Sequence, residues 1–190
     1  VTFAASGEMD NGMSVALTLE LDGNVMDTRT IALTTDGLGT ITFSGDGTSG
    51  PIGSWDDVTP TANEEAHGST LAGTMAGATN AAGTNDIFVY DYTLMDGLAL
   101  KASYVPSHTT GAVDGSMDYG INYTGFDGLS VHAAMGENND AANSADVSMI
   151  SVKYTAGAMS VGYQVNETDF GTGTADEDAT MFGVSYAISD

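Results

Sequence analysis

Strict alternation of apolar and polar residues runs through most of this chain. Between residues 119 and 135, for example, Tyr119, Ile121, Tyr123, Val131 and Met135 are separated by small or polar residues. Successive side chains of a β-strand point to opposite faces of a sheet, so this pattern predicts strands with one apolar face. Eleven strands are predicted, over residues 1–9, 13–22, 28–35, 39–45, 85–95, 97–106, 116–124, 129–136, 146–155, 158–167 and 180–188.

The predicted strands are long. Strands in globular sheets are most often about five to six residues long, and most of these are predicted to be longer. At about 3.3 Å per residue and a tilt of about 45°, ten residues span roughly 25 Å, which is the height of the apolar band of an outer-membrane barrel.

The connections between the strands alternate in length. Short connections with Asp-Gly, Asn-Gly or similar turn residues lie at residues 10–12, 36–39, 96–97, 125–128 and 155–158, and such residues supply the positive φ angles of tight hairpins. Longer polar connections are predicted at residues 23–27, 46–84, 107–115, 137–145 and 168–179. Short turns at one edge and long loops at the other predict an all-β, up-and-down antiparallel meander.

The two faces of the predicted sheet differ in polarity. One face is apolar throughout, whereas the other is polar, with interspersed Ala and Gly. Glu8 is predicted on the polar face, as are the residues expected to line a pore: Glu20, Asp91, Lys101, Asp118, His132 and Lys153. Arg29 and Asp146 share the parity of the apolar face, so we expect them on that face or at its rim.

Such a sheet can be placed in two ways. In a soluble sandwich two apolar faces stack, whereas in a transmembrane barrel the apolar face contacts lipid and the polar face lines water. Tyr104, Tyr123, Tyr154 and Tyr186 fall near strand ends, where an interfacial aromatic girdle would lie. With the strand lengths and the loop alternation, this favours the barrel.

Charge and composition narrow the function. Lys and Arg total 3 against 26 Asp and Glu, a formal net charge of -23. This excludes nucleic acid as a partner, because neutralising phosphates needs clustered cations, and makes cations the natural mobile partners. The absence of cysteine excludes disulfides and thiolate metal sites. Three scattered histidines and a glycine-rich GDGTSG without Lys match no catalytic or phosphate-binding motif, so the sequence predicts a protein that is not an enzyme.

Several segments resemble the general porins of Gram-negative outer membranes, of the alphaproteobacterial kind. They are SGEMDNGMSVALTLEL, DGLGTITFSGD, IFVYDYTLMDGLALKASYVP and YTGFDGLSVHAAMG, which together extend over nearly the whole chain. The resemblance implies a sixteen-stranded barrel, usually a homotrimer, surrounded by outer-membrane lipid and lipopolysaccharide and needing no cofactor. Since eleven strands cannot close an even-stranded barrel, we expect residues 1–190 to be one porin domain with terminal segments missing.

The resemblance also gives the segment 46–84 a role. In porins a long third loop folds into the lumen and narrows it. Here that segment carries the only tryptophan, Trp55, and His67. It also carries the constriction acids that the resemblance implies: Asp46, Asp56, Asp57, Glu64 and Glu65. Only Lys101 and Lys153 are available for the opposing basic wall. The sequence therefore predicts a water-filled pore for ions and small hydrophilic solutes that prefers cations.

Two alternatives stay open. Asp56, Asp57, Glu64 and Glu65 could coordinate calcium, as could residues 174–180, although solvated acidic loops explain both stretches. An acidic calcium-binding surface protein, such as an adhesin or an S-layer module, is therefore the alternative to the porin. A substrate-specific barrel, recognised by a saturable current that sugars block, is a third possibility.

Overall fold

The computed structural model describes residues 1–46, 48–55, 58–60, 86–107, 115–139, 144–171 and 176–188 of the chain. The elements in these ranges are β1 (Thr2–Glu8), β2 (Ser14–Asp22), β3 (Val25–Thr35), β4 (Gly39–Asp46), α1 (Pro51–Trp55), β5 (Ile87–Met95), β6 (Leu98–Val105), β7 (Ser116–Tyr123), β8 (Leu129–Asn138), β9 (Ala145–Ala156), β10 (Met159–Phe170) and β11 (Glu177–Tyr186). All eleven predicted strands are confirmed. No helix of the described residues is long and apolar enough to cross a membrane.

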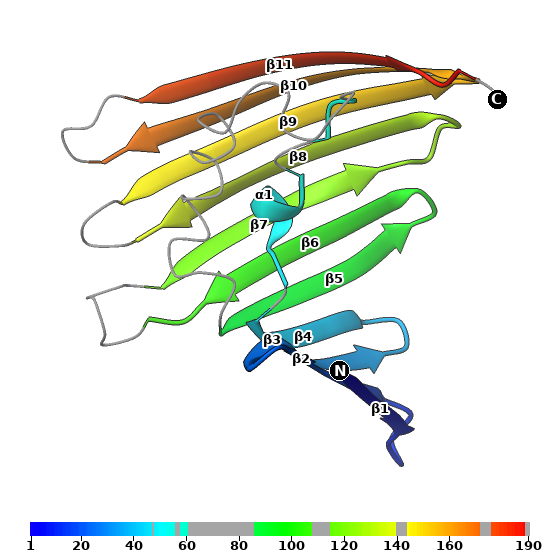
Figure 1. Ribbon diagram of the computed structural model, residues 1–190, viewed down its shortest axis with the longest axis vertical. Helices are drawn as coiled ribbons and strands as arrows, with labels where there is room; N and C mark the ends of the chain where they lie inside the picture. The colour runs from blue at the N-terminus through cyan, green and yellow to red at the C-terminus, as the bar shows by residue number, and fades with distance from the viewer. Residues whose placement is uncertain are drawn as a thin grey trace.

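The strands form one antiparallel sheet in which each strand pairs with the next along the chain, from β1 to β11. Figure 1 shows the short turns gathered at one edge of this sheet. The short Asp-Gly turns are as predicted: Gly97 and Gly128 have φ angles of 75° each, which only glycine adopts without strain.

One predicted connection is wrong. Residues 23–27 were expected to form a longer loop, but β2 and β3 are joined directly by Gly23 and Asn24. A shift in register between Glu20 and Leu21 absorbs an extra residue and lets β3 begin earlier than its apolar alternation indicates. Val25, Met26 and Asp27 therefore belong to β3.

The sheet has no apolar core of the ordinary kind. We call the face that α1 contacts the inner face and the opposite one the outer face. Large apolar side chains crowd the outer face and remain exposed: Tyr119 at 51%, Ile150 at 51% and Phe182 at 73%. A soluble protein rarely exposes an apolar surface of this extent, so this face must be covered by something other than water.

The inner face is less polar than its alternation indicates. Ile87, Val89 and Val105 form one buried apolar cluster on it. A second buried cluster joins Ile52 of α1 to Ala134, Val147 and Met149 of β8 and β9. On β5 and β6 the aromatic residues Phe88 and Tyr104 dominate the alternation and obscure the first cluster. The second cluster becomes evident only from its contact with Ile52 of α1.

Candidate functional site

The short helix α1 lies against the inner face, where it contacts β6, β7, β8 and β9 (Figure 1). Its start is fixed by Asp118 of β7. The backbone N–H of Ile52 donates a hydrogen bond to Asp118 Oδ2 at 3.0 Å. The hydroxyl of Ser103 donates to the other carboxylate oxygen. Asp118, expected from the sequence to line the pore, is 1% exposed. It therefore acts as an anchor for α1 and presents no free charge to the lumen.

The end of α1 is held by Gln164 of β10, which is fully buried. Its Nε2 donates to the carbonyl oxygen of Trp55 at 3.1 Å and to Asn166 Oδ1 at 2.9 Å. Its Oε1 accepts a hydrogen bond from the backbone N–H of Val58 at 3.1 Å. One amide side chain thus satisfies two backbone groups of the segment, the carbonyl of Trp55 and the N–H of Val58, and holds the chain where the helix ends.

Glycines on the inner face let this segment approach the sheet closely. A Cβ atom added to Gly120 of β7 would lie 2.6 Å from Cζ3 of Trp55, and one added to Gly162 of β10 would lie 2.5 Å from Cδ of Pro60. Gly183 of β11 lies under the backbone of Pro60 in the same way. Any side chain at these positions would displace the segment, so the glycines are what allow it to pack directly on the sheet.

Two further predicted pore residues also contact α1. Lys101 Nζ of β6 donates a hydrogen bond to Ser54 Oγ at 3.0 Å. The ring of His132 lies 5.1 Å from that of Trp55, tilted by 38°, and His132 Nδ1 lies 3.1 Å from Ser151 Oγ. His132 is therefore a buried packing residue, and Lys101 reaches from the wall to the helix.

The other described candidates lie apart from α1. Glu20 of β2, Asp91 of β5 and Lys153 of β9 are on the inner face by strand parity, as predicted. Asp46 ends β4, where a register shift sets it opposite Arg29 of β3. Arg29 shares the outer face with the apolar residues, as expected, and its Nη2 donates to the carbonyl oxygen of Gly45 at 2.7 Å.

The remaining candidates lie outside the described residues. These are Asp56, Asp57, Glu64, Glu65 and His67. Their roles at a constriction, and calcium binding by the four acids, stay predictions. Within the described ranges, no group of three or more His, Asp or Glu side chains is placed to hold a metal ion.

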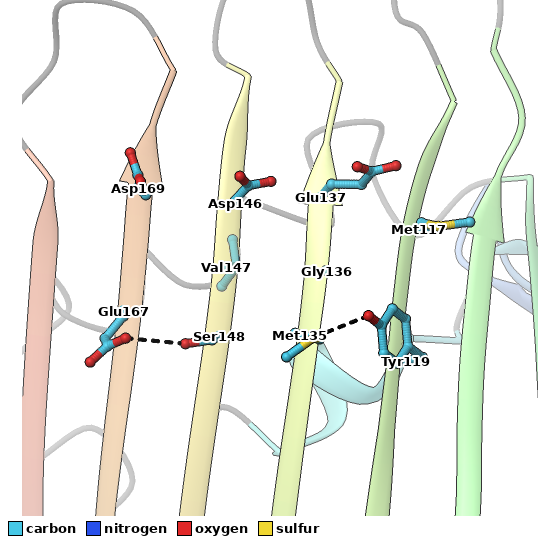
Figure 2. Close-up of a pocket in the computed structure, with 10 residues that line it drawn as sticks. All are labelled: Met117, Tyr119, Met135, Gly136, Glu137, Asp146, Val147, Ser148, Glu167 and Asp169. Atoms are coloured by element: carbon cyan, nitrogen blue, oxygen red, sulfur yellow. Dashed lines mark hydrogen bonds between the residues drawn. The ribbon is translucent and has the colours of Figure 1, made fainter.

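An acidic row crosses the outer face at the end of the strands away from the short turns. Glu137 of β8, Asp146 of β9 and Asp169 of β10 are direct neighbours in register, and Figure 2 shows them on adjacent strands. With Glu167 below them they border a hollow of about 390 Å³ whose other lining includes Met135. Asp146 lies on the apolar parity, as predicted, beyond the apolar residues of β9.

Sequence reasoning missed Gln164 as a functional residue and misjudged Asp118. Both follow the parity of the polar face, and the polar face of a barrel normally contacts water. A weak signal was present in the glycines that share this face, Gly120, Gly162 and Gly183, because a row of missing side chains indicates that another segment approaches closely.

The fold and the site together define a class of protein. A meander of long antiparallel strands with an apolar outer face and a segment folded against its inner face is the wall of a transmembrane β-barrel. The sequence matches the Gram-negative porin family over residues 1–190. The chain belongs to this family and is thus a protein of the Gram-negative outer membrane.

Solved structures have the same fold. A loop L8 deletion mutant of OmpT, an outer membrane protein of Vibrio cholerae, has a TM-score of 0.75 and 19% identity, with 100% of this chain and 68% of that chain covered. The trimer form of in-vitro folded OmpT has a TM-score of 0.71 and 18% identity over 100% and 64% of the two chains. The anion-selective porin from Comamonas acidovorans has a TM-score of 0.56 and 17% identity over 98% and 63%.

At such identities the likeness concerns the fold alone. The chain spans about two-thirds of the length of these proteins, between 63% and 68%. Among curated protein sequences, none matches it.

Proposed function

We propose that the chain forms much of the wall of a water-filled channel through which ions and small hydrophilic solutes diffuse without chemistry. The observation that carries this proposal is the attachment of residues 50–55 and 58–60 to the inner face. Asp118 and Gln164 hold the backbone of this segment by hydrogen bonds, and glycines of the sheet leave room for it to pack closely. A segment fixed inside a barrel narrows its lumen, which sets a size limit for passing solutes.

Cation preference is the finer part of the proposal. The net charge of -23 supports it, as does the small number of cations on the inner face. Lys101 and Lys153 are the only Lys or Arg residues on that face, because Arg29 is on the other one. Carboxylates along a narrow, low-dielectric passage attract cations and repel anions. The anion selectivity of the Comamonas porin does not contradict this proposed cation preference, because the two chains are similar in fold and only 17% identical in sequence.

The test is the reversal potential of the full-length protein in planar bilayers across a potassium chloride gradient. Large, linear conductance steps with a cation-selective reversal potential are expected. Replacing Glu64 and Glu65 by Gln should move the reversal potential toward zero, whereas Asp146→Asn on the outer face should leave it unchanged. Absence of channels, with a protein that stays soluble without detergent, would contradict the proposal and favour the calcium-binding surface protein.

We further propose that the protein assembles as a homotrimer in contact with outer-membrane lipid and lipopolysaccharide. The exposed apolar outer face and the trimer form of the OmpT structure support this. Cross-linking in intact membranes, followed by electrophoresis without heating, should give a species of three times the monomer mass. A monomer under those conditions would contradict it.

A further inference from the structure

A second hollow lies on the inner face, between α1 and the turn that joins β3 to β4. Its volume is about 530 Å³, and its lining includes Asp36, Trp55, Asp91, Thr93, Lys101 and Asn122. This volume falls in the range of sites that hold small molecules, about 300–1,000 Å³. The hollow is on the wall that solutes would pass on the short-turn side of α1.

The hollow is lined by two acidic residues, Asp36 and Asp91, and by one basic residue, Lys101. Asp91 and Lys101 are direct cross-strand partners on β5 and β6. Lys101 Nζ is drawn toward α1 by its hydrogen bond to Ser54 Oγ at 3.0 Å. The carboxylate of Asp91 forms no hydrogen bond to another described residue and is exposed to the hollow. Asp91 and Lys101 are thus adjacent charges of opposite sign, and Asp36 adds a second carboxylate from the turn between β3 and β4.

An apolar surface and an amide complete the lining. Trp55 packs on His132 and over Gly120, so its indole is held rigidly while it also borders the hollow. The side chain of Asn122 borders the hollow too, and its Oδ1 is buried without a hydrogen-bond partner among the described residues. A fixed aromatic surface beside hydrogen-bonding groups is typical of small-molecule sites.

We infer that this hollow is a binding site for a small zwitterion of about the size of a dipeptide. The ammonium group of the solute pairs with Asp91, its carboxylate pairs with Lys101, and an apolar side chain contacts Trp55. A simple cation would leave Lys101 without a counter-charge, and a simple anion would leave Asp36 and Asp91 without one. The inference rests on the proposed function, because the hollow is useful only if solutes pass along this face.

Trp55 is the single tryptophan of the chain and reports binding directly. We would titrate the full-length protein in detergent with glycyl-phenylalanine and follow tryptophan fluorescence, with Trp55→Phe to assign the signal. The matched ligand is acetyl-glycyl-phenylalanine amide, which keeps the shape and lacks both charges. A saturable change is expected with the free dipeptide, and binding weaker by about tenfold or more with the blocked one.

Variants locate the site. Asp91→Asn and Lys101→Gln should each weaken dipeptide binding by about tenfold, and Asp146→Asn on the outer face should not. Ser54→Ala keeps the lysine charge and removes its contact with α1, so it should retain most of the binding. Equal losses in Lys101→Gln and Ser54→Ala would show that Lys101 only positions the helix, and would overturn its assignment.

Conductance without dipeptide separates this inference from the proposed function. Open channels that the free dipeptide does not bind overturn the inference alone, whereas a protein without channels overturns the function beneath it. Equal binding of free and blocked dipeptides, or tighter binding of maltose, would also overturn it, because the pocket would then recognise shape or hydroxyl groups. Saturable block of the current by the free dipeptide supports it.

Discussion

Removing the carboxylate of Asp118 should release the start of α1 from the channel wall. Asp118 accepts a hydrogen bond from the backbone N–H of Ile52, and Ile52 is fully buried. In Asp118→Ala this N–H keeps its burial and loses its partner, at a cost of about 1–3 kcal/mol. The hydroxyl of Ser103 can rotate to another acceptor, so it adds little. The docking equilibrium of the segment should therefore fall by about 5- to 150-fold.

Hydrogen–deuterium exchange of the full-length protein in detergent measures this directly. Peptides covering residues 50–55 should exchange faster in Asp118→Ala by a factor in that range, with the strand amides of β9 and β10 unchanged. Asp118→Asn should stay near the wild type, because its Oδ1 can accept from Ile52 and its amide can donate to Ser103. Asp146→Asn is the control for loss of a carboxylate. Unchanged exchange at residues 50–55 in Asp118→Ala would refute the anchoring role.

Three further substitutions test how the segment packs on the sheet and how the short turns are formed. Gly120→Val should push Trp55 off the sheet, because even a Cβ would lie 2.6 Å from the indole; a red-shifted tryptophan emission is expected, and an unshifted spectrum would contradict the close packing. Gln164→Leu leaves the N–H of Val58 without its partner, so proteolysis near residues 55–60 should accelerate while residues 50–52 keep their slow exchange. Equal proteolysis rates in the variant and the wild type would contradict the role of Gln164 in holding the end of α1. Gly128→Ala meets a φ of 75° and should lower stability by about 1–2 kcal/mol, seen as a lower midpoint of thermal unfolding, whereas no change would mean that the turn rearranges.

The strands could be predicted almost completely from local pattern. Period-two alternation and Asp-Gly turns act over a few residues, and both operate whatever surrounds the sheet. The prediction failed at residues 23–27 because a register shift between β2 and β3 depends on the pairing of two strands. Gly23, Asn24 and Asp27 made this stretch resemble a loop.

The sequence by itself determined the sheet, the sides to which most side chains point, and the excess of negative charge. The tertiary structure alone decided which inner residues touch water and which hold the segment. Asp118 meets a residue 66 positions away, and Gln164 one 106 positions away. Such contacts arise where a curved sheet brings distant strands under one helix. The alternation that places Asp118, Asp91 and Gln164 on the same face therefore cannot tell an anchor from a pore-lining charge.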